Sequence, residues 1–123
     1  MLKQGKLIAI VDDDESIRSA LGGLMKSAGL PARTFASAEE FLESGDQAAT
    51  ACLLADVRMP GMSGLELQAA LNTADSRIPI IFITAHGDEK IRTQALKAGA
   101  LEFVSKPFDD EALLASIRKT LEN

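Results

Sequence analysis

This chain of 123 residues has no tryptophan or tyrosine, and only one cysteine and one histidine. It therefore lacks the aromatic side chains that would stack on a flavin. A single cysteine excludes an internal disulfide, which fits a reducing cytoplasm. Cys52 lies within an apolar run, so we predict a small core residue and not a reactive thiol.

Excess positive charge and long hydrophobic runs are also missing. The net charge is −5, so we expect no direct contact between this domain and nucleic acid. The apolar runs reach only strand length, which argues against a membrane span. Met1–Lys6 is a polar lead-in without the apolar segment of a signal peptide. We therefore expect one cytoplasmic domain over residues 1–123, with one core.

Three continuous apolar runs predict strands that are covered on both faces. They are Leu7–Val11, Ala51–Ala55 and Pro79–Ile83. Two weaker runs, Leu30–Phe35 and Leu101–Val104, contain polar or charged residues and read as edge strands.

Helical patterns separate these strands. Capping-box spacings at Ser37–Glu40 and Ser63–Glu66 predict the starts of two helices. The helix at about 88–98 has a thin apolar stripe of Ile91, Ala95 and Ala98, with Leu96 beside it. We predict that it is weakly held and mobile. The last helix starts near Asp109.

Alternation of strands and helices predicts an α/β fold, a (βα)5 doubly wound parallel sheet. The order 2-1-3-4-5 puts the three apolar strands inside and the two polar ones at the edges. Ligands of such sheets bind at the switch point, here at the carboxyl ends of strands one and three. Asp12 and Asp13 follow the first of these strands and Asp56 follows the other, facing solvent above the sheet.

Three carboxylates that converge repel one another unless a cation is present. Their hard oxygen atoms favour Mg²⁺, with Mn²⁺ as a substitute. Lys106, after the last strand, can reach toward Asp56, and the Thr84 hydroxyl can donate a hydrogen bond. A phosphoryl group on Asp56 would then meet a metal, an ammonium and a hydroxyl, as phosphoryl transfer requires. Taken singly, acids after strands are often only helix caps, and we predict that Asp14 is one.

The joint arrangement resembles the receiver domain of bacterial two-component response regulators, over the whole chain. The matching motifs are Val11–Glu15, Asp56–Gly64, Thr84–Ala85 and Ser105–Phe108. The residues around Asp56 and at Lys106–Asp109 are most similar to FixJ-type transcriptional regulators, which carry a LuxR-type output domain. The resemblance implies a flavodoxin-like fold and a switch that assists its own phosphorylation and dephosphorylation, not an enzyme.

By position, the resemblance implies that a sensor histidine kinase phosphorylates Asp56. Asp12, Asp13, Asp56 and the backbone carbonyl of Arg58 would hold Mg²⁺. Thr84 and Lys106 would bind the phosphoryl oxygens, and the Lys106–Pro107 peptide bond would be cis.

The same resemblance places the switch at Thr84 and Phe103, although Phe103 also reads as a plain core aromatic. The output surface would be formed by the helix at 88–98, the last strand and the last helix, and would make a phosphorylation-dependent homodimer. Arg58 and His86 are candidates for tuning the lifetime of the acyl phosphate, and His86 also reads as an exposed loop residue. An effector domain beyond Asn123 would make the protein a transcription regulator.

Three other readings stay open at this point. An aspartyl-phosphate phosphatase would carry a second acid two residues after its nucleophile, where this chain has Arg58, and would need room for a cap. A flavodoxin-like carrier would have a Ser/Thr-rich phosphate loop where this chain has Asp12–Asp14. A degenerate receiver that only binds proteins would not need the complete set of site residues.

Overall fold

The computed structural model describes residues 6–85 and 88–122. The elements are β1 (Leu7–Val11), α1 (Glu15–Ser27), β2 (Ala32–Phe35), α2 (Ala38–Ser44), the short helix η1 (Gln47–Ala49), β3 (Thr50–Ala55), α3 (Gly64–Thr73), β4 (Ile80–Thr84), α4 (Glu89–Lys97), β5 (Glu102–Ser105) and α5 (Asp110–Glu122). All five strands are parallel and lie in the order β2-β1-β3-β4-β5. The predicted fold class and strand order are thus confirmed. Within the described ranges, no helix is long and apolar enough to cross a membrane.

The burial of each strand follows its sequence. β4 is buried along its whole length, and β1 and β3 are buried at all positions but one. Three of the four residues of β2 are exposed, and β5 has no fully buried residue. The two polar strands are therefore the edges of the sheet, as predicted.

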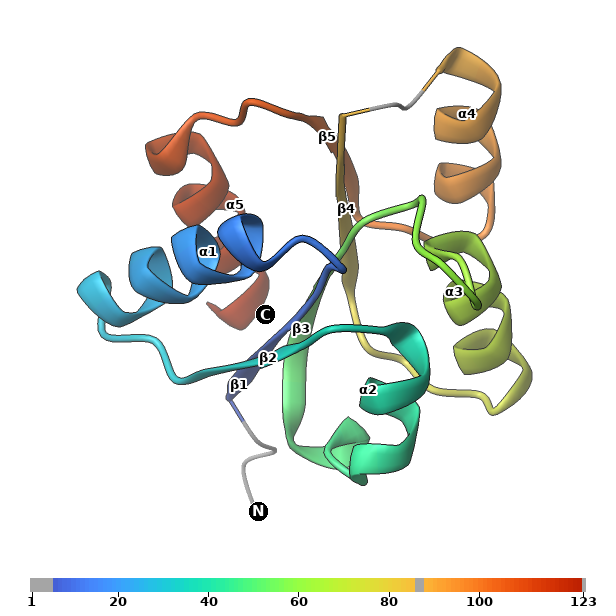
Figure 1. The fold of residues 1–123 in the computed structure, drawn as a ribbon, viewed down its shortest axis with the longest axis horizontal. Helices are drawn as coiled ribbons and strands as arrows, with labels where there is room; N and C mark the ends of the chain where they lie inside the picture. Colours follow the sequence, from blue (N-terminus) through green and yellow to red (C-terminus); the bar gives the residue numbers. More distant parts are fainter. Residues whose placement is uncertain (1–5, 86–87, 123) are drawn as a thin grey trace.

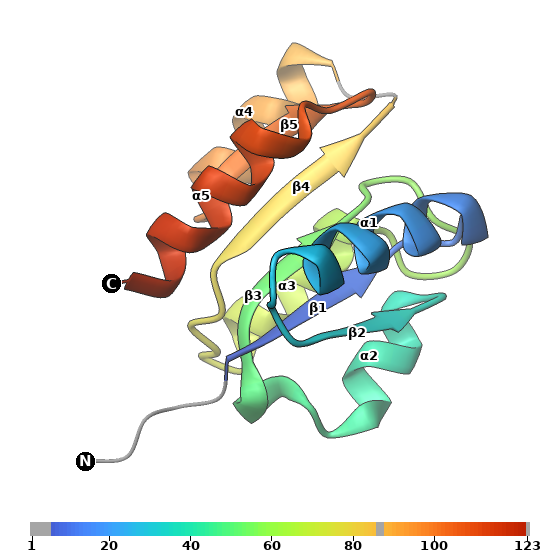
Figure 2. The same ribbon diagram turned by 90° about the vertical axis from the view of Figure 1, so that its left-hand side faces the viewer.

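The helices cover the two faces of the sheet unequally. α1 and α5 lie on one face, and α2, α3 and α4 lie on the other (Figures 1 and 2). The first face is packed with residues such as Ile10, Cys52 and Ile83.

Cys52 is fully buried, as predicted, and burial raises the pKa of its thiol to about 12. It is therefore a core residue and a poor nucleophile near neutral pH.

Three helix N-caps were predicted, and two of them have the expected hydrogen bonds. The Asp14 carboxylate accepts from the backbone N–H of Ser16 and caps α1. Ser63 and Glu66 form a reciprocal capping box at α3. Ser37 caps α2, but the Glu40 carboxylate accepts from the N–H of Ala36 and not from that of Ser37. The capping box predicted there is therefore only half correct.

α4 buries very little of its surface. Of its predicted apolar stripe, only Ala95 is buried, Ile91 is half-buried, and Ala98 is exposed, contrary to the prediction. Leu96 is 37% exposed. Apolar contact with the sheet thus contributes little to holding this helix, and its mobility stays a prediction.

Candidate functional site

Three carboxylates meet at the carboxyl ends of β1 and β3. Val11 pairs with Ala55 in neighbouring strands, and the N–H of Asp56 donates to the carbonyl of Val11 at 3.1 Å. The residues that follow, Asp12 and Asp56, are therefore held side by side. One carboxylate oxygen from each of Asp12, Asp13 and Asp56 can be chosen so that all three lie within 4.8 Å of one another.

The depth of Asp56 differs from the prediction. It was expected to face solvent, but only 9% of it is exposed, and Asp12 is 2% exposed. The loop after β3 and the side chain of Lys106 lie against Asp56, so the carboxylate is largely covered. Asp13 is the exposed member of the group.

Lys106 reaches across β4 from the end of β5, as predicted. Its Nζ lies 3.0 Å from Oδ2 of Asp56 and 3.1 Å from Oδ2 of Asp12. The Lys106–Pro107 peptide bond is cis, which confirms that prediction. The backbone N–H of Lys106 donates to the carbonyl of Thr84 at 3.0 Å, so these two residues are adjacent at the ends of β4 and β5.

The other carboxylate oxygens are held by the backbone. Oδ1 of Asp12 accepts from the N–H of Asp14 at 2.9 Å, and Oδ1 of Asp56 accepts from the N–H of Arg58 at 3.2 Å. The Arg58 side chain is exposed. Both buried acids are thus fixed in orientation before any ligand arrives.

The Lys106 ammonium is paired with two of the three acids at this site. Burial raises the pKa of Asp12, and the N–H of Asp14 and the charge of Lys106 oppose that shift without cancelling it. Burial would lower the pKa of Lys106, but its hydrogen bonds to Asp56 and Asp12 and the negative charges of these two residues together outweigh burial and raise the pKa. Lys106 is therefore charged at neutral pH, and the site retains excess negative charge.

A hard divalent cation fits these residues. The donors are carboxylate oxygens, the site has excess negative charge, and the exposed side at Asp13 is open to water. Mg²⁺ prefers oxygen ligands and keeps several of its waters. The acidic cluster that such an ion needs is present, with two of its members buried.

Thr84 and Phe103 lie on the same face of the sheet. Thr84 pairs with Ser105, and Phe103 pairs with Phe82, two residues before Thr84. Side chains two residues apart in a strand share a face. Thr84 is 1% exposed, whereas Phe103 is half-buried with its ring 6.3 Å from that of Phe82. His86, the remaining predicted residue, lies outside the described residues.

Two residues that position the loop after Asp56 were missed by the sequence reasoning. Oε2 of Glu39, on α2, accepts from the N–H of Met62 at 2.9 Å. A Cβ atom on Gly64 would lie 2.1 Å from the carbonyl oxygen of Asp56. Both contacts depend on how the loop folds back, so neither leaves a periodic signal in the sequence. Only Gly64, as the first residue of a capped helix, could have been suspected.

The close approach of Gly64 gives a prediction with a matched control. We expect Gly64→Ala to destabilise the fold by about 1–3 kcal/mol or more, because the backbone of Asp56 must shift. Gly23, in the middle of α1, has nothing within 4 Å of an added Cβ. Gly23→Ala should therefore stabilise the protein by about 0.4–1 kcal/mol. Urea unfolding of both variants tests this, and equal effects would refute the contact.

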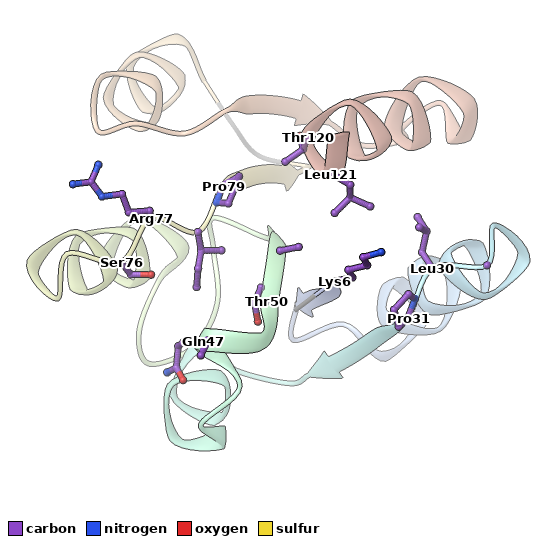
Figure 3. A pocket seen from close by; sticks show the side chains of 14 residues that line it. Lys6, Leu30, Pro31, Gln47, Thr50, Ser76, Arg77, Pro79, Thr120 and Leu121 are labelled. Atoms are coloured by element: carbon purple, nitrogen blue, oxygen red, sulfur yellow. The ribbon is translucent and has the colours of Figure 1, made fainter. Parts of the chain in front are cut away.

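A hollow lies at the opposite ends of the strands from the three carboxylates. Its volume is about 840 Å³, and it is lined by residues at the amino ends of the strands, such as Lys6, Leu30, Thr50 and Pro79 (Figure 3). Among the described residues predicted for the site, none lines it. Its size does not make it the reactive site, because the carboxylates and Lys106 converge at the carboxyl ends of the strands.

The sequence matches a known protein family along most of its length. The model of the family described as "Response regulator receiver domain" matches residues 8–118. The chain is 48% identical to the response regulator protein TmoT of Ectopseudomonas mendocina, over 99% of this chain and 56% of that protein. It is 41% identical to the transcriptional regulatory protein FixJ of Azorhizobium caulinodans, over 93% of this chain and 54% of that protein.

A solved structure of a relative, FixJ-N, has the same fold as this chain. The crystal structure of FixJ-N superimposes with a TM-score of 0.87 at 37% identity, covering 98% of this chain and 97% of that one. The chain spans about half the length of the curated relatives it matches. The resemblance to FixJ is confirmed at the level of family, since FixJ proteins are among the relatives. This chain belongs to the family of response regulator receiver domains.

Proposed function

We propose that the chain is a phosphoacceptor switch, which takes a phosphoryl group on Asp56 from a sensor histidine kinase in a Mg²⁺-dependent reaction. One observation carries the proposal. The Asp12, Asp13 and Asp56 carboxylates converge within 4.8 Å, and the Lys106 ammonium lies 3.0 Å from the acceptor. A structural ion pair alone would not need two further acids beside it.

Each residue of the site has a separate role in phosphoryl transfer. Asp12, Asp13, Asp56 and the backbone carbonyl of Arg58 would hold Mg²⁺, which supplies charge neutralisation. An oxygen of Asp56 attacks the phosphorus atom in line. The bond from phosphorus to the donor breaks, and the leaving group keeps its electron pair. Lys106 then binds the new phosphoryl oxygens, and the hydroxyl of Thr84 donates to them.

The signal is proposed to leave through Thr84 and Phe103. Movement of Thr84 toward the phosphoryl group frees space on the face of the sheet that it shares with Phe103, whose ring can then turn inward. This alters the surface of α4, β5 and α5. Two large apolar side chains near that surface, Leu96 and Leu101, are 37% and 50% exposed, which suits a contact between two copies.

The test is the change of oligomeric state on phosphorylation. We expect wild type to shift from monomer to dimer in sedimentation with Mg²⁺ and beryllofluoride, a mimic of the phosphoryl group. Thr84→Ala should bind the mimic but dimerise much less, because it cannot donate the hydrogen bond. Full dimerisation of Thr84→Ala, with the NMR signals of the Phe103 ring unmoved, would show that this coupling is wrong.

Arg58 and His86 are proposed to tune how long the acyl phosphate survives. Arg58 donates its backbone N–H to the carboxylate of Asp56, so its exposed side chain begins close to the phosphoacceptor. Unchanged rates of phosphate release in Arg58→Ala and His86→Ala would dismiss both residues. An output domain that regulates transcription is likewise proposed, because relatives such as FixJ are named transcriptional regulators.

A further inference from the structure

The last turn of α4 is attached to α3 by two side-chain amides. Nε2 of Gln68 donates to the carbonyl of Ala95 at 3.0 Å, and Nδ2 of Asn72 donates to the carbonyl of Ala98 at 3.0 Å. Gln68 and Asn72 are four residues apart, so they project from the same side of α3. The two helices are neighbours on one face of the sheet (Figure 1).

These bonds act on a helix that has few other attachments to the described part of the chain. Ala95 is the only buried residue of α4, and its carbonyl also accepts from the N–H of Ala100. Ala98 is the C-cap, where carbonyls have no partner within the helix. Gln68 is 2% exposed, so separating it from Ala95 would leave a buried donor unsatisfied. The carboxyl end of α4 is therefore the firmly held end.

The amino end of α4 is held differently. Its cap is local, because the Asp88 carboxylate accepts from the N–H of Ile91 within the same turn. Ile91 is only half-buried and packs against the apolar core. Among the residues that the structure describes, the side-chain hydrogen bonds between α4 and a neighbouring helix are thus at its carboxyl end, which makes that end a natural pivot.

α3 also touches the phosphoacceptor at its other end. Gly64, its first residue, packs so closely on the carbonyl of Asp56 that an added Cβ would lie 2.1 Å from that oxygen. The N–H of Gly64 donates to the carbonyl of Val57 at 2.8 Å. α3 therefore runs from the reactive residue to the carboxyl end of α4.

We propose that Gln68 and Asn72 are positioning residues that anchor the carboxyl-terminal turn of α4 to α3, so that α4 responds to phosphorylation by pivoting about this end. The pivoting rests on the proposed function of Asp56. The anchor does not, because it is present in the unphosphorylated protein.

The anchor is tested by substitutions at Asn72, because this residue is exposed and a change there leaves the core intact. Asn72→Asp keeps the shape but replaces the donor with an acceptor that faces a carbonyl. Asn72→Lys restores a donor and adds a positive charge that suits the carboxyl end of a helix. Thr73→Asp, at the adjacent exposed position, is the matched control for added charge in the last turn of α3.

The measurement is hydrogen exchange of the α4 amides in the unphosphorylated protein, with α1 as the internal reference. We expect Asn72→Asp to speed exchange by about tenfold, as loss of one hydrogen bond implies. Asn72→Lys and Thr73→Asp should stay within about twofold of wild type. Equal acceleration by Asn72→Asp and Thr73→Asp would overturn the anchor, and so would an Asn72→Lys variant as fast as Asn72→Asp.

The pivot is tested on wild type with Mg²⁺ and beryllofluoride. We expect exchange to change in the first turn of α4 and to stay constant in its last turn. Equal changes at both turns would overturn the pivot. If no part of the chain responds, the phosphoacceptor role and the pivot fail together, while the Asn72 variants still decide the anchor.

Discussion

Lys106→Met is expected to slow phosphoryl transfer from acetyl phosphate by about 10²–10³-fold, the usual effect of removing one preorganised partner of the developing charge. Methionine keeps most of the apolar stem of lysine and removes only the ammonium. That ammonium lies 3.0 Å from Asp56, where the new phosphoryl oxygens would form. The rate is measured by intact mass against time at fixed Mg²⁺.

The same variant should not bind Mg²⁺ more weakly. The ammonium of Lys106 bonds to Oδ2 of both Asp12 and Asp56, so it competes with a metal for these oxygens. We expect Lys106→Met to bind Mg²⁺ at least as tightly as wild type while it transfers slowly. Lys90→Met, at an exposed lysine of α4, is the control. Equal loss of binding and of rate in Lys106→Met would indicate a collapsed site and contradict the assigned role.

Asp12→Asn is expected to abolish most of the stabilisation that Mg²⁺ gives the folded protein. At a concentration of 100 times Kd, Mg²⁺ should stabilise wild type by about 2.7 kcal/mol. Removing one anionic ligand should weaken Mg²⁺ binding by at least about 100-fold. Substituting a residue that only hydrogen-bonds to a metal ligand can already weaken metal binding by up to about 100-fold. At the same Mg²⁺ concentration the variant would then gain only about 0.4 kcal/mol.

Thermal unfolding with and without Mg²⁺ measures how much the metal stabilises the folded protein. Asp14→Asn is the matched control, because it is the same chemical change two residues away, and asparagine caps a helix as well as aspartate does. Its response to Mg²⁺ should equal that of wild type. A full response from Asp12→Asn would place the metal elsewhere.

Much of the fold was predictable because burial leaves a pattern in the sequence. Runs such as Leu7–Val11 are apolar at every position because both of their faces are covered. The charged residue Glu102 identified β5 as an edge strand, because a strand at the edge of the sheet is not fully covered. Strand order then followed from burial classes, and with it the convergence of Asp12 and Asp56.

Contacts of single side chains were not predictable in the same way. Glu39 reaches Met62 across 23 positions, and Gln68 reaches Ala95 across 27. Each pair depends on the conformation of intervening loops and on helix rotation, which periodicity does not record. The burial of Asp56 was missed for a related reason: it depends on how the loop after β3 folds back against this residue.

The central claim is that Asp56 is the phosphoacceptor. The direct measurement is intact mass spectrometry after incubation with Mg²⁺ and acetyl phosphate, followed by peptide mapping. Wild type and Asp14→Asn should each gain one phosphoryl group on the peptide that contains Asp56, and EDTA should prevent it. Asp56→Asn should gain none. An equal adduct on Asp56→Asn, or none on wild type, would contradict the account.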